Sequence, residues 1–236
     1  MAKILMFGNQ KGGVGKSQVS IMTAAALSSP PFNLNVAIVD VDGQKSVVRI
    51  REVDQQSYPA DTPLPFTVLN LKVGELQKQI GQLDKEFEVL IIDAAGKLDV
   101  DAPIETQEIT KSLMYVDFLF MPFVAGNHNL TATFDYFRFV RQVQQTRQIQ
   151  PRPLHVFGFV NMFRTRSRVN QFLMQDIDDL KTSEGLTMLE TALNDYALFK
   201  EADTITSIYN NDSNDPAKAN FSAFINELLH AVQKQS

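Results

Sequence analysis

Asn9–Ser17, "NQKGGVGKS", joins an apolar run at residues 3–7 to a segment with helical character that begins at about Gly15. Glycines let a main chain wrap closely around phosphate oxygens, and the N–H groups at the start of a helix point toward such oxygens. Lys16 is placed to reach the β- and γ-phosphates of a nucleotide, and the Ser17 hydroxyl can take one Mg²⁺ position. The stretch therefore predicts a phosphate-binding loop between a strand and a helix.

This loop is a variant of the standard phosphate-binding motif. Gln10 stands five residues before Gly15, where the standard motif has a glycine, and Lys11 adds a second lysine. The alternative is a glycine-rich turn with incidental lysines. We set it aside because the preceding strand, the following helix and the Lys-Ser pair all fit the motif.

The rest of the chain alternates short apolar runs with segments of helical period, which is typical of βα units with a parallel sheet. We expect an α/β fold of the P-loop NTPase type, with one doubly wound, mostly parallel sheet and helices on both faces. Residues 1–236 are expected to form a single domain, with no separate N-terminal DNA-reading domain because the first strand begins at residue 3. The expected strands cover residues 3–7, 35–40, 66–71, 87–96, 117–123 and 154–161, with a weaker one around 187–193.

Two further strands end on carboxylates. "VDVDGQKS" carries Asp40 and Asp42, and "VLIIDAAG" carries Asp93. Asp93 has the form of an aspartate that holds Mg²⁺ directly or through water, and Gly96 would let the following loop respond to a γ-phosphate. A pair such as Asp40 and Asp42 in a loop most often forms a turn. Its place one βα unit after the phosphate loop instead favours orientation of water or the outer shell of the metal.

Composition excludes several classes of protein. The chain has no cysteine, which removes disulfides, thiol catalysis, zinc–thiolate sites and iron–sulfur clusters. No apolar segment is long enough for a membrane-spanning helix or the core of a signal peptide. The amphipathic segment at residues 221–232 lacks the flanking cations of a membrane-surface helix, so we expect it to pack on the sheet. The expectation is a cytoplasmic protein without a membrane partner.

Arginines gather in residues 136–175, which contain no Asp or Glu although the net charge of the chain is −5. The stretch is either a solvated polar surface or an anion-binding one, and the sequence leaves both open. Its arginines are Arg138, Arg141, Arg147, Arg152, Arg164, Arg166 and Arg168.

"KGGVGKS", "DVDGQ" and "IIDAAG" together resemble the deviant Walker A ATPases of the ParA/MinD family, and "FGFVNMFRTR" is similar to the family element whose asparagine, here Asn161, touches adenine. The resemblance implies ATP and Mg²⁺ as ligands. It assigns water positioning to Asp42 and implies that Lys11 reaches the phosphates bound by the other subunit of an ATP-dependent homodimer. Lys16 is the remaining catalytic residue. The implied metal residues are Ser17, Asp40 and Asp93, and the implied nucleotide-binding residues are Lys11, Gly12, Gly13, Val14, Gly15, Lys16, Ser17, Gln18 and Asn161.

Within that family the chain looks most like a small partition ATPase. Such a protein hydrolyses ATP weakly, is stimulated by a ParB-like or other small activator protein, and binds DNA without sequence preference. Arg164, Arg166 and Arg168 are the DNA-binding candidates, and DNA binding would place the protein at the nucleoid. Two departures from the family pattern are Gln18, where a second threonine is usual, and "DAAG", which lacks a proline.

Two alternatives of other kinds stay open. A P-loop metabolic ligase of the dethiobiotin-synthetase type shares the expected fold but normally lacks an equivalent of Lys11. A nucleotide-dependent scaffold of conjugation or DNA-transfer machinery would use the same loop residues.

Overall fold

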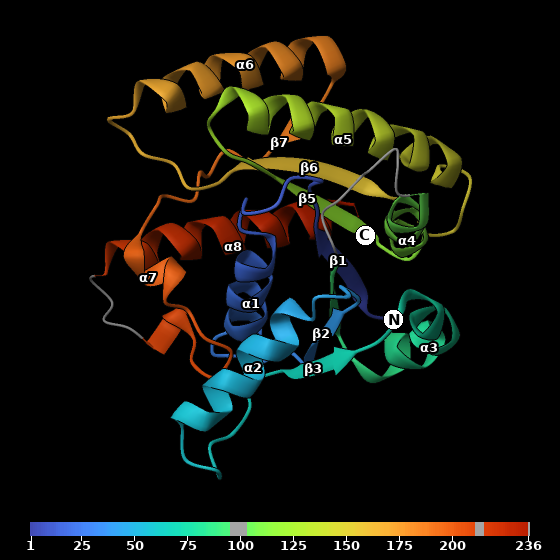
Figure 1. The fold of residues 1–236 in the computed structure, drawn as a ribbon, viewed down its shortest axis with the longest axis vertical. Helices are drawn as coiled ribbons and strands as arrows, with labels where there is room; N and C mark the ends of the chain where they lie inside the picture. The colour runs from blue at the N-terminus through green and yellow to red at the C-terminus, as the bar shows by residue number, and fades with distance from the viewer. Residues whose placement is uncertain (95–102, 211–214, 236) are drawn as a thin grey trace.

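Seven parallel strands form one sheet in the order β3-β2-β4-β1-β5-β6-β7 (Figure 1). The computed structural model describes residues 1–94, 103–210 and 215–235. The sheet confirms the fold class expected from the alternating pattern. Its strands are β1 (Lys3–Phe7), β2 (Val36–Asp40), β3 (Thr67–Asn70), β4 (Val89–Asp93), β5 (Phe118–Phe123), β6 (His155–Val160) and β7 (Thr187–Met188).

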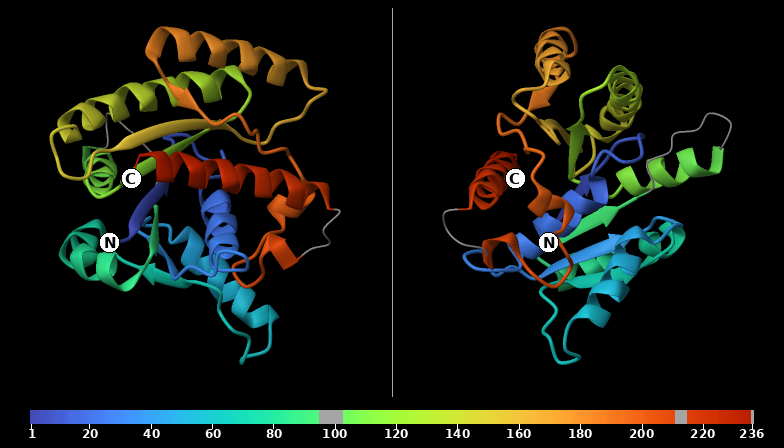
Figure 2. Two further views of the ribbon diagram at one scale, coloured as in Figure 1. Left: turned by 180° about the vertical axis from the view of Figure 1, so that it is seen from behind. Right: turned by 60° about the vertical axis from the view of Figure 1, so that its left-hand side comes forward.

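Helices cover both faces of the sheet, and each face has its own hydrophobic core (Figure 2). One core lies between the sheet and α1 (Lys16–Leu27), α2 (Ser46–Ser57), α7 (Ala197–Lys200) and α8 (Pro216–Lys234). The other lies between the sheet and α3 (Val73–Glu86), α4 (Pro103–Leu113), α5 (Asn127–Arg147) and α6 (Arg168–Glu184). A short 3₁₀ helix, η1, spans Ile208–Asn210.

The parallel register brings the polar strand ends to one edge of the sheet. β2 and β4 are neighbours, and Asp40 pairs with Asp93 across them. β1, which leads into the glycine loop, lies on the other side of β4. The carboxyl ends of β2, β4 and β1 are therefore adjacent, as ligand sites in open parallel sheets require.

The structure corrects one sequence expectation and confirms another. The weak strand expected around 187–193 is paired only at Thr187–Met188, and the main chain then bonds to β6 at isolated points, where Leu189 and Leu193 donate to Gly158 and Val160. The expected packing of the C-terminal helix is confirmed, since Phe224 of α8 packs on Phe159 with ring centroids 5.0 Å apart. No helix in the described ranges has both the length and the apolar character needed to cross a bilayer.

Candidate functional site

The glycine loop between β1 and α1 has the left-handed main chain that its glycines permit. Gly13 and Gly15 have φ of +76° and +89°. A Cβ added at Gly12 or Gly13 would meet nothing within 4 Å, so these two residues face open space. A Cβ at Gly15 would instead lie 2.5 Å from the Asn161 amide nitrogen. The loop is open where phosphate oxygens would lie and tightly packed where it meets β6.

The two lysines of the loop lie in different environments. The Lys16 ammonium donates to the main-chain oxygen of Lys11 at 3.0 Å, so it spans the loop from within. Burial lowers the pKa of Lys16, while the nearby charges of Asp93 and Asp42 oppose that shift. Lys11 itself is exposed. Its main chain is fixed while its side chain remains available to a second molecule.

Asn9 fixes the loop and was not identified from the sequence. Its side-chain oxygen accepts from the Lys11 N–H at 2.9 Å. Its amide donates to the Pro122 carbonyl at 2.9 Å and to the Thr133 hydroxyl at 2.8 Å. Asn9 is 1% exposed, so these bonds tie the loop to β5 and α5 in a buried setting. Only its position beside the glycines could have indicated this role.

Asp93, at the end of β4, lies against the first turn of α1. The Ser17 hydroxyl donates to Asp93 Oδ2 at 2.8 Å. Asp93 is buried, and burial raises its pKa to about 7, aided by the charges of Asp40 and Asp42 and opposed by the Ser17 hydrogen bond and the Lys16 charge. A buried carboxylate of raised pKa beside a hydroxyl is a site where a cation would be stabilised.

Asp40 and Asp42 occupy different environments. Asp40 is fully buried, and its carboxylate accepts from the main-chain N–H groups of Asp42, Val47 and Val48 at 3.1, 2.9 and 3.1 Å. Burial raises the pKa of Asp40 and these hydrogen bonds oppose the shift. Asp42 is partly exposed, and its carboxylate accepts from the Gln44 N–H at 2.9 Å. Asp40 thus anchors the start of α2 and the loop that carries Asp42.

A narrow pocket adjoins the phosphate loop where α1 meets the connection after β7. Asn161 follows β6 and donates from its amide to the Val14 carbonyl at 2.8 Å. Tyr196, Phe199 and Met22 form an apolar wall of the same pocket, whose volume is about 40 Å³. The two aromatic residues were not identified from the sequence because they lie at α7, a helix of only four residues that is too short to give a periodic signal.

Gln18 also lines this pocket, and its amide donates to the Ala202 carbonyl at 3.0 Å. At position 18, where the family pattern has a second threonine, this chain therefore has a glutamine whose amide contacts the connection after β7. Gln18 joins the start of α1 to the pocket wall.

The donor set fits Mg²⁺ held together with a nucleotide rather than by protein alone. Among the residues that the structure describes, no group of three or more His, Asp or Glu could hold a metal ion. Ser17 and Asp93 provide a hydroxyl and a carboxylate at one point, and the open glycine loop lies beside them. Magnesium commonly takes one or two protein groups with waters and substrate phosphates. Gly96, expected to shape the next loop, lies outside the described residues.

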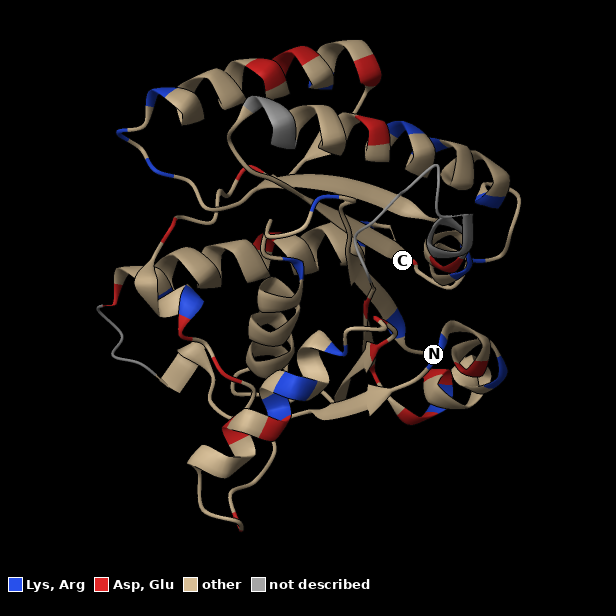
Figure 3. Cartoon of the chain, viewed as in Figure 1, with Lys and Arg blue, Asp and Glu red and all other residues tan. Residues whose placement is uncertain are grey.

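The arginine-rich stretch does not form one cationic surface. Arg147 is buried and donates to the carbonyls of Leu113, Val116 and Arg152. In the described part of the structure, five of the seven arginines make hydrogen bonds or ion pairs within the chain, whereas Arg166 and Arg168 are exposed. Figure 3 shows Lys and Arg distributed over several elements. The other pairs are Arg138 with Asp135, Arg141 with Glu184, Arg152 with Asp84 and Asp117, and Arg164 with Asp195.

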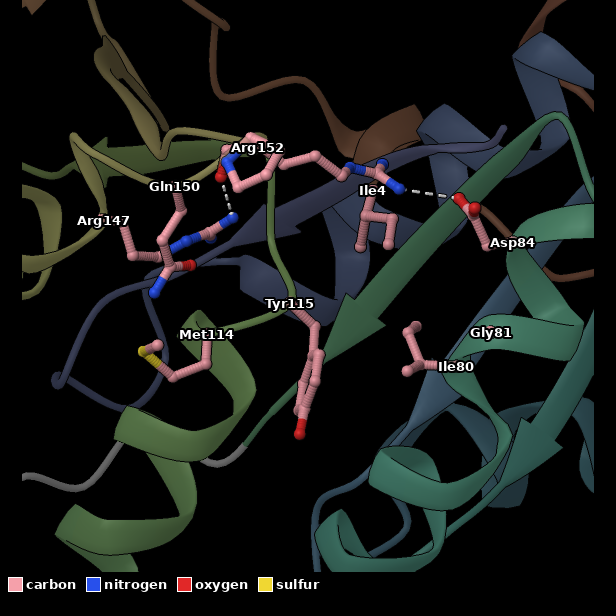
Figure 4. Close-up of a pocket in the computed structure, with 10 residues that line it drawn as sticks. Ile4, Ile80, Gly81, Asp84, Met114, Tyr115, Arg147, Gln150 and Arg152 are labelled. Atoms are coloured by element: carbon pink, nitrogen blue, oxygen red, sulfur yellow. Dashed lines mark hydrogen bonds and ion pairs between the residues drawn. The ribbon is translucent and has the colours of Figure 1, made fainter.

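A second pocket, of about 310 Å³, lies at the opposite edge of the sheet (Figure 4). It is lined by the amino end of β1, by α3 and by the segments that precede β5 and β6. Arg152 reaches Asp84 across its rim at 2.8 Å. Parallel α/β sheets bind ligands at the carboxyl ends of their strands, so the glycine-loop edge is the functional candidate.

Comparisons with known proteins agree with this geometry. Residues 5–204 match the family CbiA, described as the CobQ/CobB/MinD/ParA nucleotide binding domain. A sequence search of curated proteins finds no significant match.

The fold is similar to several solved structures. A plasmid partition protein of Borrelia burgdorferi B31 bound to AMPPNP is 18% identical with a TM-score of 0.64, over 98% of this chain and 99% of that one. A cobyrinic acid a,c-diamide synthase of Mycobacterium smegmatis with bound ATP analog and magnesium is 18% identical with a TM-score of 0.66, over 100% of this chain and 98% of that one. A complex of Cyanothece McdA with ATP is 13% identical with a TM-score of 0.69, over 96% of each chain. At these identities the likeness establishes the fold.

Proposed function

The chain belongs to the CobQ/CobB/MinD/ParA family of nucleotide-binding domains, and from that premise we propose that it is a ParA-type ATPase. It binds ATP with Mg²⁺ and forms a nucleotide-dependent homodimer. It binds DNA without sequence preference and is stimulated by a ParB-like or other small activator. Its work is to segregate or position DNA or another cargo, in the cytoplasm and at the nucleoid.

The observation that carries this proposal is that the two lysines of the loop have different environments. Lys16 is turned into its own loop, which suits contact with the β- and γ-phosphates of the nucleotide that the same chain binds. Lys11 is exposed on a main chain that Asn9 and Lys16 hold at both its N–H and its carbonyl. An exposed cation beside a phosphate site suits a role in trans, comparable to an arginine finger.

The remaining site residues take roles that their environments support. Main-chain N–H groups from Lys11 through Gln18 surround the phosphates, and Asn161 borders the base. Ser17 and Asp93 hold Mg²⁺, whose chemistry is to neutralise charge on the phosphates. Asp42 orients the attacking water. The Asp40 carboxylate accepts hydrogen bonds from three main-chain N–H groups, one of which is that of Asp42. Asp40 therefore influences the metal site indirectly, by positioning Asp42.

The proposal predicts different outcomes for the two lysines. Lys16→Ala should abolish nucleotide binding because it removes the cation inside the loop. Lys11→Ala should bind ATP normally and fail to dimerise with it. Nucleotide titration and analytical sedimentation with and without ATP separate the two effects. Normal ATP-dependent dimerisation of Lys11→Ala would contradict the trans role.

A metabolic ligase is the second candidate, because the family description includes CobQ and CobB and one structure of similar fold is that of an a,c-diamide synthase. Such an enzyme would turn over ATP only with a small carboxylic or amine substrate. ATP hydrolysis that depends on DNA and a protein activator would favour the ParA-type proposal. A nucleotide-dependent scaffold for DNA transfer would bind ATP and DNA and release no phosphate over a long incubation.

A further inference from the structure

α6 carries cations at its N-terminus and mostly carboxylates in its second half. Arg168 is its first residue and Arg166 lies two residues before it, whereas the second half contains Asp176, Asp178, Asp179 and Glu184 together with Lys181. Figure 3 shows blue at the start of α6 and mostly red in its second half. A helix macrodipole favours acids in the first turn, so Arg168 is unfavourably placed there in the isolated chain. The helix therefore presents a cationic region and a mainly acidic region along its length.

The same helix exposes large apolar side chains beside these charges. Phe172 is 62% exposed and Val169 is 49% exposed, whereas Leu173 and Ile177 on the opposite side are buried in the core. α6 lies in the outermost layer, beside α5, and its far side faces solvent in both views of Figure 2. We define the α6 face as Arg168, Val169, Phe172, Gln175, Asp176 and Asp179.

Helical geometry makes this face complementary to itself. At 3.6 residues per turn, Arg168 and Asp176 lie about 40° on either side of Phe172 and about 6 Å from it in opposite directions along the axis. A two-fold axis beside Phe172 would bring Arg168 of each copy to the same height along the helix axis as Asp176 of the other, on the two sides of the contact. It would also bring the two Phe172 rings together, a favourable contact for exposed aromatic groups.

Among the residues that the structure describes, the side chains of the two charged members of this pairing have no partner in their own chain. In the described part of the structure neither Arg168 nor Asp176 makes an ion pair or hydrogen bond, although Asp178 on the same helix pairs with Lys181 at 3.8 Å. We propose that the α6 face binds the same face of a second copy of this chain, as an antiparallel helix pair. Such an interface is isologous, so one surface supplies both halves of the contact.

A single helix pair is smaller than the interface of a stable dimer, so its association is weak and sensitive to salt. It gains strength by avidity when the copies are already joined in pairs elsewhere, as in the proposed nucleotide-dependent dimer. The α6 contact needs neither nucleotide nor DNA. It can therefore be tested, and can fail, independently of the proposed function.

The experiment is sedimentation velocity without nucleotide, at low salt and high protein concentration. The parent should self-associate, and Arg168→Asp and Asp176→Arg should each be monomeric over the same range because two attractions become repulsions. An equimolar mixture of the two variants should associate again, and so should the double variant Arg168→Asp, Asp176→Arg. Asp178→Arg is the matched control, because Asp178 lies about 120° from Phe172 around the helix and the same charge change should have no effect.

Far-UV circular dichroism establishes that each variant is folded. A monomeric parent, or variants that do not associate when mixed, would overturn the proposal. So would an Asp176→Arg protein that self-associates like the parent and binds duplex DNA more tightly, since the face would then be a DNA surface alone.

Discussion

Asp93 lies in an environment very different from that of a free carboxylate. It is buried at the end of β4, receives the Ser17 hydroxyl and lies near Asp40, and its pKa is raised to about 7. In the absence of a cation such a group favours its protonated form. The folded state then holds a proton that the unfolded chain has already lost, over the interval from about pH 4 to pH 7.

This linkage predicts a pH-dependent effect of Asp93→Asn on stability. Without nucleotide and with a chelator present, the parent should lose stability relative to the variant as pH rises from about 4 to 7, by at most about 4 kcal/mol. The sign follows because the folded parent binds more protons than its unfolded state there. Urea unfolding at several pH values measures the difference, with exposed Asp178→Asn as control. A difference that stays constant with pH would contradict the raised pKa.

At the scale of single residues, the positions of side chains could be predicted where a motif fixes the backbone. Lys16, Ser17 and Asp93 are brought together as expected, because the ends of neighbouring parallel strands must meet. The contacts of Asn9, and those of Tyr196 and Phe199 in the pocket beside Asn161, could not be predicted. Their partners lie more than a hundred residues away in the chain or in irregular segments, and no local pattern reports such contacts.

At the scale of elements, the glycine loop and α1 form one unit with the end of β6. Gly15 combines a positive φ with close approach to Asn161, whereas Gly12 has open space around it. A side chain at position 15 would therefore strain the loop, whereas a side chain at position 12 would be tolerated.

Gly15→Ala should therefore destabilise the nucleotide-free protein by roughly 1–3 kcal/mol, since it forces a side chain into left-handed backbone and against the Asn161 amide. Gly12→Ala is the matched control and should lie within about 0.5 kcal/mol of the parent. Thermal or urea unfolding without nucleotide compares them. Equal stability of the two variants would show that the Asn161 contact is easily relieved.

α2 is fastened to the chain segment that follows α7. Arg51 is buried and donates to the Thr204 hydroxyl at 2.9 Å and to the carbonyls of Phe66 and Thr204 at 3.1 Å. Asp54 accepts from both the N–H and the hydroxyl of Thr204 at 2.7 Å. Nothing in the sequence indicated this contact, because α2 itself was not predicted and the partners are about 150 residues apart.

Replacement of Arg51 by Met should cost about 2–4 kcal/mol, because it keeps the volume and leaves two buried carbonyls without donors. The exposed Arg49→Met on the same helix should change stability by less than about 0.5 kcal/mol. Chemical unfolding of both variants gives the comparison. A loss at Arg49 as large as that at Arg51 would mean that α2 depends on charge rather than on the buried contact.

At the scale of the whole molecule, charge limits how DNA can be bound. The net charge is −5, and most arginines of the 136–175 stretch are occupied within the chain. Arg164 is held by Asp195, which Lys200 also binds at 2.6 Å. Within this stretch, nonspecific DNA binding would rest on Arg166 and Arg168, with Arg164 contributing if it leaves Asp195.

Charge reversal of Arg166 and Arg168 to Glu should weaken binding to nonspecific duplex in the presence of ATP and lower the salt dependence by about one unit of slope per lost phosphate contact. Lys78→Glu with Lys85→Glu on α3 is the matched control for net charge. Co-sedimentation over a range of salt concentrations measures both. An equal loss with the α3 variant would assign the effect to overall charge.

The fold as a whole followed from the alternation of apolar strands and helical segments, because a parallel sheet needs a crossover helix between strands. The weak pairing at 187–193 was overestimated, since apolar residues there face the base pocket and α8 rather than a full strand partner. Helix α6 was missed because its exposed Phe172 and Val169 interrupt the amphipathic pattern.

The hydrogen bond from Gln18 to Ala202 joins the beginning of α1 to a stretch that Arg51 and Asp54 secure only two residues later. The chain segment after α7 is therefore held by hydrogen bonds from two helices, α1 and α2. In the proposed ATPase, a base that leaves the pocket beside Asn161 past α1 or α2 would have to break one of these hydrogen bonds.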